Sequence, residues 1–137
     1  MDEKLELLRR VPLFAAVSKR DLGEIRKLVD EVDVPAGHVL TKEGRFGEEF
    51  FLIVSGRVGI DREGVRVATM SDGDFLGEVA LIDGRPRSAT ATAEVPTQLL
   101  VLAHRQFNSL MQRFPSIQAA VLQALADRVR RTEPETS

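Results

Sequence analysis

Turns that contain glycine divide the middle of the chain into short segments, and this spacing constrains the fold more than any other feature. The turn sequences are Pro35-Ala-Gly37, Glu43-Gly44, Ser55-Gly56, Glu63-Gly64 and Asp72-Gly73. Between them, apolar residues alternate or form short runs such as Phe50–Val54, as strands do. Short strands with frequent glycine turns favour an antiparallel barrel or jelly roll, and a plain sandwich remains an alternative.

Helical patterns lie on both sides of this strand region. Before it, Ser18 precedes an apolar helical stripe and is expected to cap that helix, while Pro12 breaks the preceding one. After it, apolar residues follow a helical period with a break at Phe114-Pro115. The sequence therefore predicts helices packed at both ends of the β region.

These patterns predict a single α+β domain spanning residues 1–137. An antiparallel jelly-roll-like β-barrel is flanked by N-terminal helices and a C-terminal helix. The expected parts are N-terminal helices at 1–30, a β-roll at 31–103, C-terminal helices at 105–131 and a polar tail at 132–137.

Composition excludes several classes of protein. A net charge of -2 argues against a surface built mainly to hold nucleic acid. The chain has no cysteine, which excludes disulfides and thiolate metal sites. No apolar run is long enough to span a bilayer, and the N-terminus lacks the apolar core of a signal peptide. We expect a soluble cytoplasmic domain that contacts neither nucleic acid nor membrane directly.

One segment, GEVALIDGRPRSATATA at Gly77–Ala93, has features that packing alone does not explain. The apolar residues 79–82 fit one helical turn, whose free backbone N–H groups would form an anion site. Pro86 restricts the backbone, so that Arg87 leaves the turn in a defined direction. Its guanidinium can bond two phosphate oxygens, and Ser88 adds a hydroxyl beside it. The segment therefore predicts a phosphate site.

Glu78 is unexpected beside a phosphate, because a carboxylate repels it. The conflict disappears if Glu78 accepts a hydrogen bond from a neighbouring hydroxyl of the ligand, such as that of a ribose. A 3′,5′-cyclic nucleotide carries both groups. The alternative reading is a solvated hairpin turn at Asp83–Arg87, with arginines that serve solubility.

This segment resembles the phosphate-binding cassette of the cyclic-nucleotide-binding domain family, here residues 77–90. Further stretches are similar to the family, namely PLF near the start, FFLIVSGRVGI at Phe50–Ile60 and DGDFLGE at Asp72–Glu78. The resemblance implies a cyclic nucleotide as ligand and a regulatory role. It covers nearly the whole chain.

By this resemblance, Arg87 binds the equatorial phosphate oxygen and Glu78 binds the ribose 2′-hydroxyl. Backbone N–H groups of Gly77, Glu78 and Ala80 help to line the phosphate. Ser88 can contact phosphate or a syn guanine, so cyclic GMP stays possible while cyclic AMP is preferred. The expected ligand-binding residues are Gly77, Glu78, Val79, Ala80, Arg87, Ser88 and Ala89.

The resemblance also implies a base pocket covered by the last helix, which acts as a lid. Val58 and Ala68 are expected as walls for the base. The chain has no tyrosine or tryptophan, so Arg128 is the candidate to stack on the purine. Alternatively, Arg128 extends into solvent at the helix end.

No catalytic or metal-binding constellation is evident, since His38 and His104 lie far apart and no serine has a partner arrangement typical of a nucleophile. We therefore predict a sensor without cofactor or enzymatic activity, signalling through its C-terminal helix to an effector protein or an effector domain in a longer chain. The alternative is a nucleotide-independent protein-interaction domain that retains the barrel. We expect Arg87→Ala to weaken binding with little effect on the fold, because the empty site should be open to water.

Overall fold

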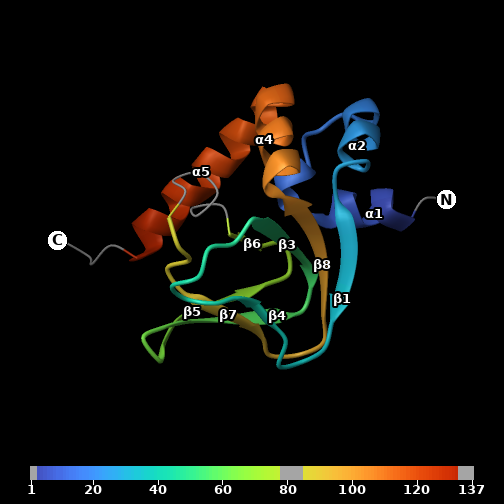
Figure 1. The fold of residues 1–137 in the computed structure, drawn as a ribbon. Helices are drawn as coiled ribbons and strands as arrows, with labels where there is room; N and C mark the ends of the chain where they lie inside the picture. The colour runs from blue at the N-terminus through green and yellow to red at the C-terminus, as the bar shows by residue number, and fades with distance from the viewer. Residues whose placement is uncertain (1–2, 78–84, 133–137) are drawn as a thin grey trace.

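The computed structural model describes residues 3–77 and 85–132, and Figure 1 shows their arrangement. Antiparallel strands are flanked by helices on the N-terminal and C-terminal sides, so the predicted α+β class is confirmed. The elements are α1 (Glu3–Arg10), η1 (Pro12–Phe14), α2 (Lys19–Ile25), β1 (Asp30–Val34), β2 (Val39–Thr41), β3 (Glu49–Ser55), β4 (Arg57–Arg62), β5 (Val65–Ser71), β6 (Phe75–Leu76), β7 (Thr90–Ala93), β8 (Thr97–Ala103), α4 (His104–Arg113) and α5 (Pro115–Thr132).

The strands form two antiparallel sheets of four strands each. The first has the order β1-β8-β3-β6 and the second the order β2-β7-β4-β5. Their inner faces share one apolar cluster, in which Phe51 and Ile53 of the first sheet meet Val58, Ala91 and Ala93 of the second. The architecture is therefore a jelly-roll-like pair of packed sheets, which combines the two β alternatives left open by the sequence.

Strand β3 shows why its sequence is a continuous apolar run. Successive side chains of a strand point to opposite faces. Phe50, Leu52 and Val54 pack with the helices, whereas Phe51 and Ile53 pack between the sheets. Because both faces of β3 are buried, both sets of positions must be apolar.

The helices cover the outer face of the first sheet (Figure 1). The ring of Phe50 lies between those of Phe75 and Phe107, with centroid distances of 5.5 and 4.8 Å. Helix α2 begins after Ser18, whose Oγ accepts a hydrogen bond from the N–H of Asp21 at 3.1 Å, so the expected cap is confirmed. Within residues 3–77 and 85–132, no helix is both long and apolar enough to span a membrane.

Candidate functional site

A pocket of about 390 Å³ lies between the second sheet, the turn before β7 and helix α5. Apolar side chains from β4, β5 and β6 form one part of its lining, namely Ile60, Met70 and Leu76. The turn at residues 85–89 forms another part, and Arg128 of α5 borders it from the helix side. The pocket thus brings segments together that lie far apart in the sequence.

Arg87 is the most buried charged residue of this lining, with 6% of its surface exposed. Its Nη1 donates to the carbonyl of Gly77 at 2.9 Å, and its Nη2 donates to the carbonyl of Glu49 at 2.7 Å. These bonds fix the guanidinium at the edge of the pocket. The side chain of Arg87 is enclosed next to Glu49 of β3 and Gly77, so its removal is expected to affect the fold more than the sequence suggested.

The backbone of Arg87 is fixed as well. Its N–H donates to the carbonyl of Arg45 at 2.8 Å, and its own carbonyl accepts from the N–H of Gly44 at 2.8 Å. The turn therefore pairs with the loop between β2 and β3 as a short extension of the sheet. This pairing, together with Pro86, sets the direction in which the Arg87 side chain leaves the turn.

Gly77 must be glycine for two reasons. Its φ of 97° lies in the left-handed region that side chains disfavour. A Cβ at this position would also lie 2.6 Å from the carbonyl oxygen of Glu49, which is too close for any real contact. The glycine allows the chain to turn so that its carbonyl reaches Arg87.

The residues that follow Arg87 are bonded to neighbouring strands. The Nε of Arg62 donates to the carbonyl of Ser88 at 3.1 Å, and the hydroxyl of Thr41 donates to the carbonyl of Ala89 at 3.2 Å. Ser88 itself is exposed and lines the pocket. The hydroxyl of Ser88 therefore borders the pocket, and side chains of β2 and β4 hold the backbone around it in place.

Ile60 and Met70 lie where the sequence predicted Val58 and Ala68 as walls. Val58 is fully buried between the sheets, and Ala68 is exposed on β5; neither lines the pocket. In the β4–β5 register, Val58 pairs with Met70 and Ala68 pairs with Ile60. Each expected residue is thus the cross-strand neighbour of one that lines the pocket. The sequence could have identified Ile60 and Met70 only with the register of this hairpin, and the face that it turns to the pocket, already known.

Arg128 does not extend into solvent. Its guanidinium lies 4.3 Å from the ring centroid of Phe75, and its Nη2 donates to the carbonyl of the same residue. The side chain therefore points toward the β region, as the stacking hypothesis requires, and its aromatic partner here is Phe75 of β6. Because Phe75 adjoins Leu76 and Gly77 in the lining, this contact lies at the border of the pocket.

The structure brings together Gly77, Arg87, Ser88, Ala89 and Arg128 from the predicted set. Three other predicted residues, Glu78, Val79 and Ala80, lie outside the described residues. Sequence reasoning did not assign a role to Thr41, Arg62 or Arg85, which also line the pocket. Among the described lining residues, the four charged side chains are all arginines, so this part of the wall suits an anion.

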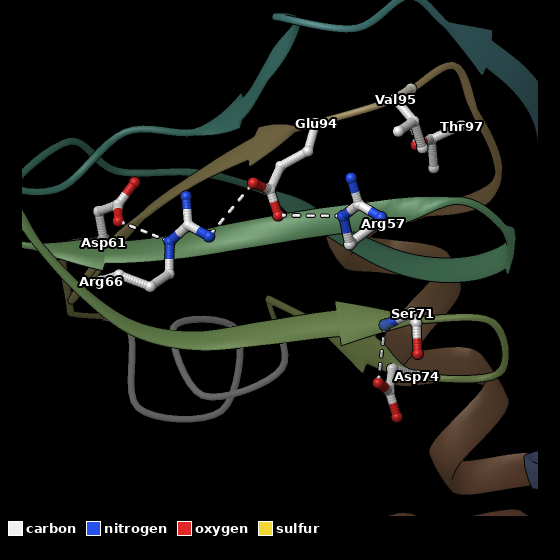
Figure 2. Close-up of polar contacts among 8 residues, drawn as sticks. All are labelled: Arg57, Asp61, Arg66, Ser71, Asp74, Glu94, Val95 and Thr97. Atoms are coloured by element: carbon white, nitrogen blue, oxygen red, sulfur yellow. Dashed lines mark hydrogen bonds and ion pairs between the residues drawn. The ribbon is translucent and has the colours of Figure 1, made fainter.

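The outer face of the second sheet carries a separate row of charges, which Figure 2 shows. Glu94 contacts Arg57 at 3.5 Å and Arg66 at 3.3 Å, and Arg66 also bonds Asp61 at 2.8 Å. The bond to Asp61, supported by Glu94, raises the pKa of the Arg66 guanidinium. None of these four residues lines the pocket, and within the described ranges no cluster of three or more His, Cys, Asp or Glu could hold a metal.

Known proteins resemble this chain over most of its length. A family model for the cyclic nucleotide-binding domain matches residues 31–114. The chain is 36% identical to a cyclic nucleotide-gated potassium channel of Rhizobium etli, over 90% of this chain and 34% of the channel. It is 30% identical to a CRP-like cAMP-activated global transcriptional regulator of Mycobacterium tuberculosis, over 93% of this chain and 59% of the regulator.

One similar solved structure is the co-crystal structure of the regulatory domain of Toxoplasma gondii PKA with cAMP. The TM-score is 0.67 and the identity 30%, over 80% of this chain and 45% of that chain. In all three comparisons, the chain spans less than two thirds of the relative.

Proposed function

The chain belongs to the cyclic nucleotide-binding domain family, and we propose that it is a sensor that prefers cyclic AMP over cyclic GMP and signals by movement of its C-terminal helix. The observation that carries this proposal is the buried guanidinium of Arg87, fixed at the edge of a pocket with an apolar floor. The family is regulatory rather than catalytic, so binding is the activity of the site.

The phosphate is proposed to meet Arg87 and the turn around it. The cyclic phosphate is a compact monoanion, and one guanidinium held by main-chain bonds presents its donors without reorganisation. In this assignment Gly77, Val79, Ala80 and Ala89 complete the phosphate site, and Ser88 lies beside it. Glu78 takes the ribose 2′-hydroxyl. The pocket volume of about 390 Å³ lies within the usual range for small-molecule sites.

The preference for cyclic AMP rests on two observations. The Mycobacterium tuberculosis relative is described as cAMP-activated, and the Toxoplasma gondii relative was crystallised with cAMP. The pocket places Ile60 and Met70 where a base can lie, and burial against apolar groups costs more for guanine, which carries a ring carbonyl that adenine lacks. Ser88 offers guanine one hydroxyl in return.

Movement of α5 is proposed to follow from the position of Arg128. A ligand changes a conformational equilibrium only if it binds the two states differently. Arg128 reaches both Phe75 and the pocket, so a bound purine that attracts its guanidinium favours a position of α5 in which the contact with Phe75 is altered. The position of α5 thereby depends on whether the cyclic nucleotide is bound.

The partner is proposed to be an effector protein, or an effector domain in a longer chain. The channel and the transcriptional regulator that resemble this chain are both longer than the region they share with it. The two relatives are of different kinds, a channel and a transcriptional regulator, and we propose that residues 3–132 themselves contact neither DNA nor membrane. A cytoplasmic location is part of the same proposal, since a chain without cysteine suits a reducing compartment.

The test is thermal unfolding of the purified chain with cyclic AMP, cyclic GMP and 5′-AMP in parallel. Ligand at about a hundredfold its dissociation constant adds roughly 2.7 kcal/mol to stability, which raises Tm visibly. We expect the largest shift with cyclic AMP, a smaller one with cyclic GMP and none with 5′-AMP. A larger shift with cyclic GMP would overturn the stated preference.

A second function is favoured by one observation. Both η nitrogens of Arg87 donate to main-chain carbonyls, so this arginine can serve the fold alone. The corresponding function is a protein-interaction domain that keeps the two sheets and binds no nucleotide. The absence of any shift with the three nucleotides at roughly millimolar concentration, about the weakest binding of interest, would favour this function.

A further inference from the structure

We infer that Gly47 is a positioning residue for Arg87, because the missing side chain at this position creates the space in which the guanidinium lies. Gly47 belongs to the loop between β2 and β3. The inference deepens the proposed function, on which its binding test rests. Gly47 is expected to act on the phosphate site through Arg87 and not to contact the ligand itself.

The steric argument is direct. A Cβ at Gly47 would lie 2.6 Å from Nη2 of Arg87, 2.8 Å from its Cζ and still closer to its Nε. Cβ atoms in proteins essentially never approach another heavy atom to less than 3.0 Å. Any side chain at position 47 therefore displaces the guanidinium, the loop or both.

The backbone does not require glycine at position 47. Its φ lies outside the left-handed region, in contrast to Gly44 at 83° and Gly77 at 97°. Alanine at position 47 therefore carries no left-handed backbone strain. Substitution at Gly77 would combine backbone strain with a collision, whereas substitution at Gly47 tests the space around Arg87 alone.

The guanidinium of Arg87 should move rather than the main chain, because the main chain is the more rigid of the two. The carbonyl of Glu49 belongs to β3 and that of Gly77 directly follows β6, whereas the guanidinium is the far end of a flexible side chain. An added methyl group is therefore expected to push the guanidinium out of its site and to break its bonds to both carbonyls. Arg87 then remains charged but no longer faces the proposed phosphate position.

The experiment is a double-mutant cycle of Gly47→Ala and Arg87→Ala, with cyclic AMP binding measured by calorimetry. We expect Gly47→Ala to weaken binding about tenfold when Arg87 is present, as expected for loss of charge-assisted hydrogen bonds. In the Arg87→Ala background, the same change should alter affinity by less than about twofold, because the group it displaces is already gone. Equal losses in both backgrounds, or no loss at all, would overturn the inference.

Gly59→Ala provides the matched control. A Cβ at Gly59 would collide with the guanidinium of Arg66, just as one at Gly47 collides with that of Arg87, and Gly59 also has no left-handed φ. Arg66 lies on the outer face, away from the pocket. Gly59→Ala should leave affinity within about twofold of the original, which separates displacement of Arg87 from displacement of an arginine in general.

Thermal unfolding without ligand tests the inference independently of nucleotide binding. We expect Gly47→Ala to lower Tm by about 3 °C when Arg87 is present, since two hydrogen bonds of a buried group are lost. In the Arg87→Ala background it should not lower Tm, because alanine restricts the unfolded chain. If the original chain binds no cyclic nucleotide, the proposed function fails, and this second cycle alone decides the role of Gly47. The same decrease in both backgrounds would contradict that role.

Discussion

The two arginines at opposite sides of the pocket are held in different ways. Arg87 is buried, and its guanidinium bonds two main-chain carbonyls, that of Glu49 in the first sheet and that of Gly77 directly after β6. Arg128 is half-buried on α5, where it stacks on Phe75 and bonds one carbonyl. One region of the pocket is thus part of the β framework, and the other belongs to a helix whose Arg128 contacts that framework at Phe75.

This difference separates two tasks of a sensor. A group that recognises a constant part of the ligand, such as its phosphate, gains from being fixed before binding. A group that reports binding must instead have two arrangements of similar free energy, because a ligand can shift only an equilibrium that already exists. The structure suits Arg87 to the first task and Arg128 to the second.

The largest expected effect is that of Arg87→Ala on affinity. Removal of the guanidinium should weaken cyclic AMP binding by at least about tenfold, because a hydrogen bond to a charged group contributes roughly 1.5–3 kcal/mol. It should also lower Tm, since the carbonyls of Gly77 and Glu49 lose their donor. Calorimetry and thermal unfolding measure the two effects. Arg66→Ala on the outer face is the control and should leave affinity unchanged; retained affinity in Arg87→Ala would remove this residue from the phosphate site.

A smaller effect is expected for Arg128→Ala. Loss of one cation–π contact with the base should change affinity by about two- to fivefold, as such an interaction contributes about 0.5–1 kcal/mol where water has access. Amide hydrogen exchange in the last turns of α5 should become faster without ligand, because the contact with Phe75 is gone. Arg128→Lys keeps the charge and serves as the matched variant. A loss as large as that of Arg87→Ala would mean that the helix carries the main anion contact, and the comparison would be reversed.

Ser88→Ala should change selectivity more than affinity. Its hydroxyl borders the pocket and is the group proposed to contact guanine. We expect the affinity for cyclic GMP to fall about threefold to tenfold further than that for cyclic AMP, as the loss of one neutral hydrogen bond predicts. Competition binding with both nucleotides measures the ratio. Equal losses would assign the hydroxyl to the phosphate, which the two ligands share.

The smallest effect is expected at Glu24, far from both arginines. Its hydrogen bond and charge contact with Lys27, and to a lesser degree with Arg113 of α4, lower its pKa below the ordinary 4.5. A lowered pKa in the folded state stabilises the protein above the unfolded value, and this contribution disappears as pH falls through the folded value.

The fall in Tm between pH 7 and pH 4 should therefore be smaller in Glu24→Gln than in the original chain. The difference should be under about 1 °C, because the pair is exposed and screened by solvent. Lys27→Gln should give a similar reduction. A pH dependence unchanged by either substitution would show that the ion pair of Glu24 with Lys27 adds nothing to stability.

The β framework was predictable because its signals are local. The apolar run of β3 follows from burial on both faces, and the glycine turns separate the strands as expected. Ser18 caps α2 by accepting a hydrogen bond from the N–H of Asp21, which is only three residues away in the sequence. The position of Arg87 at the pocket likewise follows from Pro86 and the turn.

The partners of these residues were not predictable because they depend on tertiary pairing. The carbonyl of Glu49 and the space at Gly47 meet Arg87 only after the loop between β2 and β3 pairs with the turn. Ile60 and Met70 line the pocket because of the hairpin register and the irregularity between Ile60 and Asp61. No pattern along the chain could place the ring of Phe75 beneath Arg128.

Amide hydrogen exchange of the original chain, with and without saturating cyclic AMP, tests the difference between the two regions most directly. The account predicts altered protection in the C-terminal half of α5, with unchanged protection in β3, which bonds Arg87 through Glu49, and in its neighbour β8. Saturated binding with no change in α5 would contradict the assignment of this helix as the responsive region.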